Sequence, residues 1–199
     1  MKVFIVGMPQ SGRTTVAKAL SQLNGYCYVD AASWIRSSFR EKKDKELQQH
    51  YQDEYHSWLL KRLKNTPNMI VDNVNNSISS YIEGENFIID GIFSPQDFVS
   101  LFDFKKDIVV FLNRTNNQSE YKDYENIGVS VLRDYCFWLS SAELLDKDNW
   151  YEYNFNIPGT ASNEVKTLGH KNSVFIVKSI AGVINHLQNR LVNLRAPQS

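Results

Sequence analysis

The sequence has little cysteine and no long apolar run. Its 199 residues include two cysteines, Cys27 and Cys136, without a CxxC pair or a Cys/His spacing typical of a metal site. Two thiols in a chain of this length argue against a disulfide framework and indicate a reducing compartment with both thiols buried. The apolar run at residues 2–6 is too short for a signal peptide or a membrane span. A cytoplasmic protein without a membrane partner is therefore expected.

The sequence also lacks net charge, and this limits its possible partners. Lys and Arg number 22, as do Asp and Glu, so the formal net charge is zero. No global field then draws the chain to nucleic acid or membrane, and such binding would need local patches. With 42% hydrophobic and 13% aromatic residues, the composition is that of a globular domain with a sizeable core.

Short apolar runs alternate with helix-like segments along the chain. Strands are expected at residues 2–6, 25–30, 86–90, 107–113 and 150–157. Apolar runs rich in β-branched residues are typical of buried parallel strands. Residues 158–171 form an expected loop, and 172–192 an expected closing helix. The pattern predicts an α/β fold with a five-stranded parallel sheet covered on both faces, in a single domain over residues 1–199.

The first expected strand ends in a glycine-rich turn, "GMPQSGRT" at residues 7–14. Its spacing matches the phosphate-binding loop G-x-x-x-x-G-K-[ST], except that Arg13 replaces the usual Lys. Arg keeps the charge and can grip phosphate bidentately, although it is a planar fork and not a point charge. The alternative is a glycine turn that only joins a strand to a helix. The expected nucleotide contacts are Gly7, Met8, Pro9, Gln10, Ser11, Gly12, Arg13, Thr14 and Thr15.

Two further expected strands end in a carboxylate, Asp30 and Asp90. The carboxyl ends of parallel strands meet along one rim, where ligands bind. There a carboxylate can take a proton from an attacking hydroxyl or hold Mg²⁺, together with the Thr14 hydroxyl. The alternative for both is helix capping, which is common for an Asp that precedes a helix.

Arginines follow these strands at several places. Arg36 and Arg40 lie four apart after Asp30, on one face of an expected helix, and could hold an acceptor phosphate. Arg133 lies in an expected helix near a lid-like region at about residues 114–145 and could stabilise the charge of a transferred phosphoryl group. The alternative for each is a solvated surface arginine.

The segment after Asp30, about residues 31–85, mixes aromatic and basic residues. Its aromatic residues stand close to the basic stretches "REKKDK" and "LKRLK", and they include Trp34, Phe39, Tyr51, Tyr55 and Trp58. Such interleaving suits single-stranded nucleic acid or a base drawn from a duplex. A helical hairpin with its aromatics packed inward is the alternative.

Three segments in order resemble the P-loop nucleoside and nucleotide kinases, the adenylate and thymidylate kinase relatives. They are "VGMPQSGRTTVAKAL", "YVDAASWIR" and "FIIDGIFSPQDF". The resemblance implies a three-layer α/β/α sandwich with a helical acceptor and lid region. It further implies that Asp30 and Arg36 meet the acceptor and that Asp90 lies beside Mg²⁺. Three features depart from that family: Arg13 in the loop, Ser94 where an Arg is usual, and the lack of clear lid arginines. They put an ordinary nucleoside monophosphate acceptor in doubt.

Over more of its length the sequence resembles a group of phage P-loop kinases that phosphorylate 5-hydroxymethyluracil in DNA. "VVFLNRTNN" and "GVSVLRDYCFWLSSAELL" add to the shared segments. The resemblance implies an ATP- and Mg²⁺-dependent kinase acting on a modified base in DNA. Catalysis would then rest on Asp30, Arg13, Asp90 and Arg133, metal binding on Thr14 and Asp90, and acceptor binding on Asp30, Trp34, Arg36 and Arg40.

Three alternatives to this function stay open. One is a kinase for a free nucleoside or nucleoside monophosphate. Another is a nucleotide-binding module without catalysis, and a third is a DNA-binding accessory protein. The oligomeric state is left open.

Overall fold

The structure is a computed structural model of the 199-residue chain. It describes residues 1–7, 11–33, 35, 37, 51–114, 124–141, 149–155, 166–167 and 173–195. The strands are β1 (Lys2–Gly7), β2 (Cys27–Asp30), β3 (Phe87–Asp90), β4 (Ile108–Arg114), β5 (Trp150–Phe155), β6 (Lys166–Thr167) and β7 (Ser173–Val177). The helices are α1 (Arg13–Asn24), α3 (Tyr51–Asn65), α4 (Met69–Ser79), α5 (Pro95–Leu101), α6 (Tyr124–Ser141) and α7 (Ile180–Arg195).

The strands form one sheet in the order β2-β3-β1-β4-β5-β7-β6. The first six in this order pair in parallel, and the two-residue β6 pairs antiparallel with β7. The predicted α/β class and parallel sheet are confirmed, but the described chain has six parallel strands and not five. The prediction of a single domain over residues 1–199 remains a prediction.

The sixth parallel strand comes from residues expected to be helical. Residues 173–177, "SVFIV", form β7, and only Ile180–Arg195 forms the closing helix. A short apolar run is compatible with either structure by periodicity alone. Four consecutive apolar residues suit a strand buried on both faces. Residues 166–167, within the expected loop, add the short β6.

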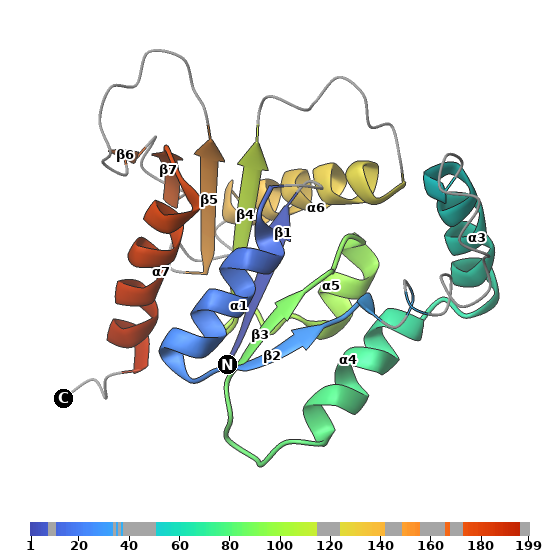
Figure 1. Cartoon of the computed structure of the whole chain (residues 1–199), viewed down its shortest axis with the longest axis horizontal. Helices are drawn as coiled ribbons and strands as arrows, with labels where there is room; N and C mark the ends of the chain where they lie inside the picture. The colour runs from blue at the N-terminus through green and yellow to red at the C-terminus, as the bar shows by residue number, and fades with distance from the viewer. Residues whose placement is uncertain are drawn as a thin grey trace.

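Helices cover both faces of the sheet (Figure 1). On one face α1 and α7 pack side chains such as Leu20 and Leu187 against Ile5 and Val110 of the sheet. On the other, α3 to α6 contribute to a second core cluster around Phe4 and Phe111. The result is the predicted three-layer arrangement, with the sheet buried between two apolar helix layers.

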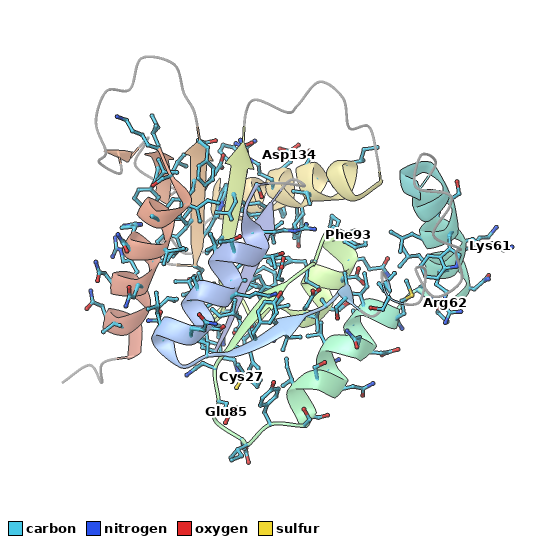
Figure 2. The ribbon with its side chains drawn as sticks, in the orientation of Figure 1. Cys27, Lys61, Arg62, Glu85, Phe93 and Asp134 are labelled. Atoms are coloured by element: carbon cyan, nitrogen blue, oxygen red, sulfur yellow. The ribbon has the colours of Figure 1, made fainter. Side chains whose placement is uncertain are left out.

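The two cysteines are free thiols, as expected, but only Cys136 is buried. Cys27 is half-buried on the edge strand β2, and its Sγ donates to Glu85 Oε2 at 2.6 Å (Figure 2). Burial and the Glu85 carboxylate raise the pKa of the Cys27 thiol to about 11. Neither thiol is therefore ionised near neutral pH.

Among the described residues, no helix combines the length and apolar character needed to cross a membrane.

Candidate active site

The glycine loop lies where β1 gives way to α1. Gly7 ends the strand, and Gly12 precedes the first helical residue with a left-handed φ of 89°. This backbone conformation favours glycine, and a Cβ there would also require the Ile180 side chain to move. Met8, Pro9 and Gln10 lie outside the described residues.

The loop offers polar groups toward the start of α1. Ser11 is buried, and its Oγ has no hydrogen-bond partner among the described residues. The first backbone N–H groups of a helix have no partners within the helix and favour an anion. The start of α1 is therefore suited to an anion such as a phosphate group, and the nucleotide contacts expected from the spacing of the loop remain a prediction.

The Asp90 carboxylate lies at the centre of the site and is almost fully buried. Thr14 Oγ1 donates to Asp90 Oδ2 at 2.6 Å, and Tyr28 Oη donates to the same oxygen at 3.4 Å. Arg13 Nε lies 3.5 Å from Asp90 Oδ1. The end of β3 is thus tied to the first turn of α1, although the two are 76 residues apart.

Arg13 also contacts the other end of the loop. Its Nη1 donates to the Gly7 carbonyl at 3.2 Å, and the residue lies mostly inside the protein. The forked guanidinium thus contacts the Gly7 carbonyl through Nη1 and Asp90 through Nε. Arg13 therefore closes the loop on itself in this structure.

Thr14 and Asp90 also meet the requirements of a magnesium site. Mg²⁺ prefers oxygen ligands and is commonly held by one or two protein oxygens together with phosphates and water. No cluster of three or more His, Cys, Asp or Glu suited to a metal occurs among the described residues, but this type of site needs none. Asp90 Oδ1 is buried without a hydrogen bond in the described chain, which leaves an acceptor that a cation could use.

Asp30 lies beside Asp90 at the same rim. The two residues are register partners in the parallel pair β2–β3. Asp30 Oδ1 accepts the N–H of Ala32 at 3.1 Å, a contact of the capping kind that was the alternative for this residue. Asp30 is half-buried. The contact with Ala32 fits the capping alternative, and the catalytic role of Asp30 remains a prediction.

Of the predicted acceptor-binding residues, only Asp30 can be placed. Trp34, Arg36 and Arg40 lie outside the described residues.

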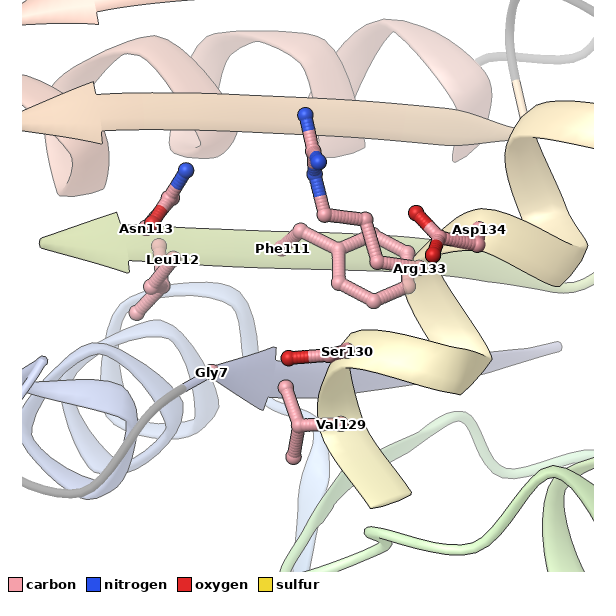
Figure 3. A pocket seen from close by; sticks show the side chains of 8 residues that line it. All are labelled: Gly7, Phe111, Leu112, Asn113, Val129, Ser130, Arg133 and Asp134. Carbon is pink, nitrogen blue, oxygen red and sulfur yellow. The ribbon is translucent and has the colours of Figure 1, made fainter. Parts of the chain in front are cut away.

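Arg133 lies on α6 and borders a recess at the ends of β1 and β4 (Figure 3). Its Nη2 and Nε donate to Glu152 Oε1 of β5 at 2.8 and 3.1 Å. Glu152 is buried, whereas the Arg133 side chain is 43% exposed. Arg133 is thus anchored to Glu152 but still largely exposed to solvent, beside a recess that Gly7 also lines, and its catalytic role remains a prediction.

Comparison of the sequence with known protein families identifies the family of this chain. The sequence profile of the AAA domain matches residues 3–126. The chain belongs to the AAA domain family. The matched range of this AAA domain includes the glycine loop, Asp30 and Asp90. No curated protein matches the chain.

Several solved structures align with most of this chain at low sequence identity, and those reported below are described as kinases. A putative kinase from Chloroflexus aurantiacus J-10-fl is 10% identical with a TM-score of 0.45, and 96% of each chain is covered. A sugar kinase from Janibacter sp. HTCC2649 is 12% identical with a TM-score of 0.40, covering 96% of this chain and 94% of that one. A gluconokinase from Sinorhizobium meliloti 1021 is 11% identical with a TM-score of 0.36, covering 97% and 92%.

Sequence reasoning missed several residues near the carboxyl ends of the strands. Tyr28 contacts Asp90, Glu152 anchors Arg133, and Asn113 pairs with Asn154 across β4 and β5. The signal for Glu152 and Asn154 was present, since both are polar residues inside the aromatic run "WYEYNF". Alternation along a strand places both on one face. Their partners could not be inferred before the sheet order was known.

Proposed function

We propose that this chain is a Mg²⁺-dependent kinase that transfers the γ-phosphoryl group of ATP to a hydroxyl group. The observation that carries the proposal is the 2.6 Å contact between Thr14 Oγ1 and Asp90 Oδ2. It brings a loop hydroxyl and a rim carboxylate together beside a phosphate-binding loop, and both are oxygen ligands suited to Mg²⁺. When bound, Mg²⁺ would neutralise phosphate charge there.

Each remaining residue has a defined task in this reaction. The loop and the start of α1 hold the ATP phosphates, and Arg13 adds positive charge at the same place. Asp30 accepts the acceptor's hydroxyl proton while the acceptor oxygen bonds to the γ-phosphorus. The bond from that phosphorus to the β–γ bridging oxygen breaks, and ADP leaves.

We further propose that the acceptor is the hydroxymethyl group of 5-hydroxymethyluracil in DNA. Support comes from the sequence resemblance and from one face of α3. There Trp58, Lys61, Arg62 and Asn65 line a hollow of about 310 Å³, and Lys61 and Arg62 project away from the sheet (Figure 2). Residues 57–68 carry three basic and no acidic side chains, which suits a DNA strand in a protein of zero net charge.

A non-catalytic nucleotide-binding module is the rival that one observation favours. Arg13 lies 3.5 Å from Asp90 Oδ1, one of the carboxylate oxygens that a metal would need. A module of this kind would bind ATP without acceptor-dependent release of ADP.

Transfer of labelled γ-phosphate from ATP separates these functions. The acceptors are DNA with 5-hydroxymethyluracil, unmodified DNA, and a panel of free nucleosides and monophosphates. We expect label on the modified DNA alone, and a loss of at least about 100-fold in Asp30→Asn and in Arg13→Ala. Asp103→Asn, in the turn before the amino end of β4 and so at the far end of the strand from the loop, is the matched control and should keep full activity.

Label on a free nucleotide would instead indicate a metabolic kinase. ATP binding without label on any acceptor would favour the non-catalytic module. Turnover within a few-fold of wild type in both variants would remove Asp30 and Arg13 from the mechanism.

A further inference from the structure

The two oxygens of the Asp90 carboxylate have different surroundings. Oδ2 accepts the Thr14 hydroxyl at 2.6 Å and the Tyr28 hydroxyl at 3.4 Å. Oδ1 has no hydrogen bond in the described part of the chain, and Arg13 Nε lies 3.5 Å from it. The hydroxyl groups therefore orient the carboxylate through Oδ2, while Oδ1 faces the positive charge of Arg13.

This ion pair lies well inside the protein. The Asp90 side chain is 1% exposed and the Arg13 side chain is 13% exposed. Water and salt screen a pair at such depth much less than a pair on the surface, and a buried carboxylate without a cation is costly. Arg13 thus provides positive charge where the Asp90 carboxylate needs it.

The Arg13 guanidinium also has a second contact with the protein. Its Nη1 donates to the carbonyl of Gly7, the last residue of β1, and β1 is paired with β3, which ends at Asp90. Residue 13 is at the same time the position at which the loop spacing predicts a phosphate ligand. The guanidinium therefore has two alternative sets of partners, the oxygens of the protein and the oxygens of a phosphate group.

A divalent cation at Asp90 would have to share the carboxylate with this guanidinium. Like charges close together repel strongly where bulk water is largely absent. Pairing of Arg13 with Asp90 and binding of a metal to Asp90 are therefore unfavourable together. Phosphate oxygens remove the conflict, because they offer the guanidinium another anionic partner that it can hold with two hydrogen bonds.

We propose that Arg13 and a divalent cation compete for Asp90, and that phosphate in the loop decides between them. While Arg13 pairs with Asp90, a divalent cation binds weakly to this carboxylate. When phosphate oxygens engage Arg13, Asp90 becomes available to the metal. The inference rests on the proposed function, whose nucleotide and metal share this site, and it concerns the regulation of that site.

Metal binding in the absence of any nucleotide tests the competition. Mn²⁺ accepts the same oxygen ligands as Mg²⁺, and free Mn²⁺ in a titration of the protein is measured by electron paramagnetic resonance. Arg13→Met should bind Mn²⁺ about 10-fold more tightly than wild type, because the competitor for Asp90 is gone. The gain should vanish in the double variant Arg13→Met/Asp90→Asn.

Lys18→Met is the matched control for a general loss of positive charge. Lys18 belongs to the same helix, is exposed, and lies over the Tyr28 ring at 5.8 Å from its centroid. Its removal should change Mn²⁺ affinity by less than about 2-fold, since water screens an exposed charge. Melting temperatures identify variants that fail to fold. Equal Mn²⁺ affinity of wild type and a folded Arg13→Met, or an equal gain in Lys18→Met, would overturn the proposal.

ATP binding without metal tests the role of phosphate. In calorimetric titrations with EDTA present, Asp90→Asn should bind ATP about 5- to 10-fold more tightly than wild type, because Arg13 loses its competing partner. In the Arg13→Met background, which has no guanidinium to release, the gain from Asp90→Asn should be smaller. An equal or larger gain there would indicate plain repulsion between Asp90 and phosphate and would overturn this part of the proposal.

Neither experiment needs catalysis, so the inference and the kinase function can fail separately. An active kinase whose Mn²⁺ affinity does not change in Arg13→Met would refute the competition alone. The predicted changes in a protein that phosphorylates no acceptor would support the competition and count against the kinase.

Discussion

Asp90 is a buried carboxylate with a loop arginine 3.5 Å away. Arg13 contacts both Asp90 and the Gly7 carbonyl, through different nitrogens of its planar guanidinium. The arginine is thus part of the structure of the loop as well as a proposed phosphate ligand.

The first prediction concerns this pair. Arg13→Met should lower the free energy of unfolding by about 2 kcal/mol, since it removes hydrogen bonds that involve charged groups and leaves Asp90 without its cation. In the Asp90→Asn background, the same Arg13→Met substitution should lower the free energy of unfolding by a clearly smaller amount. Denaturant unfolding of wild type, both single variants and the double variant measures the difference. Equal losses in both backgrounds would show that Arg13 and Asp90 are not coupled.

Asp97 provides a prediction on pH dependence. It is a buried residue in the first turn of α5, and burial raises the pKa of its carboxyl from 3.8 to about 6. Between about pH 4 and 6 the folded state holds a proton on Asp97 that the unfolded state releases. The free energy of unfolding therefore falls as pH rises through this range, and above about pH 6 it is lower by about 2–3 kcal/mol.

Replacement of Asp97 should therefore stabilise the protein only at higher pH. The difference in unfolding free energy between Asp97→Asn and wild type should be near zero at about pH 4 and should favour the variant at about pH 7. Urea unfolding of both proteins across this range measures it. A difference independent of pH would contradict the raised pKa.

At the level of elements, the position of α6 depends on one close approach. A Cβ on Gly128 would come within 2.1 Å of the Phe93 carbonyl oxygen, in the segment that follows β3. The helix can therefore lie against this backbone only with glycine at that point. Val129 and Arg133, on the next turns, depend on this position to line the recess.

Gly128→Ala should consequently displace α6. We expect a loss of about 1–3 kcal/mol in unfolding free energy from overpacking. Gly182→Ala in α7 is the matched control, because its Cβ would meet only Ser179 Oγ at 3.7 Å. That variant should be neutral or stabilised by up to about 1 kcal/mol. Denaturant unfolding of both variants measures the difference, and equal stability of Gly128→Ala and wild type would show that α6 does not depend on this close approach.

On the scale of the whole molecule, zero net charge means that DNA binding depends on a local patch. If Lys61, Arg62 and Lys64 of α3 make the phosphate contacts, log Kd for single-stranded DNA should change with log salt with a slope of about 2. The double variant Lys61→Glu/Arg62→Glu should flatten this slope and weaken binding. Lys105→Glu/Lys106→Glu, in the turn before β4, should alter neither quantity. A steep slope in the α3 variant would place the DNA contacts elsewhere.

The glycine loop and the two strands that end in Asp were evident in the sequence because their signals are local. Loop spacing, β-branched runs and terminal carboxylates depend on residues within a few positions of one another. The same reasoning failed at residues 173–177, where a short apolar run fits a helix or a strand. There the choice depends on pairing with β5, a contact between distant segments.

By itself, the sequence determined the α/β class, the order of strand, loop and helix at the start of the chain, and the chemistry available at the strand ends. Only the tertiary structure decided which of these groups meet. It ties Arg13 and Thr14 to Asp90, Arg133 to Glu152, and Asn113 to Asn154. Those pairs follow from sheet order and register, which are properties of the packed chain and not of any single segment.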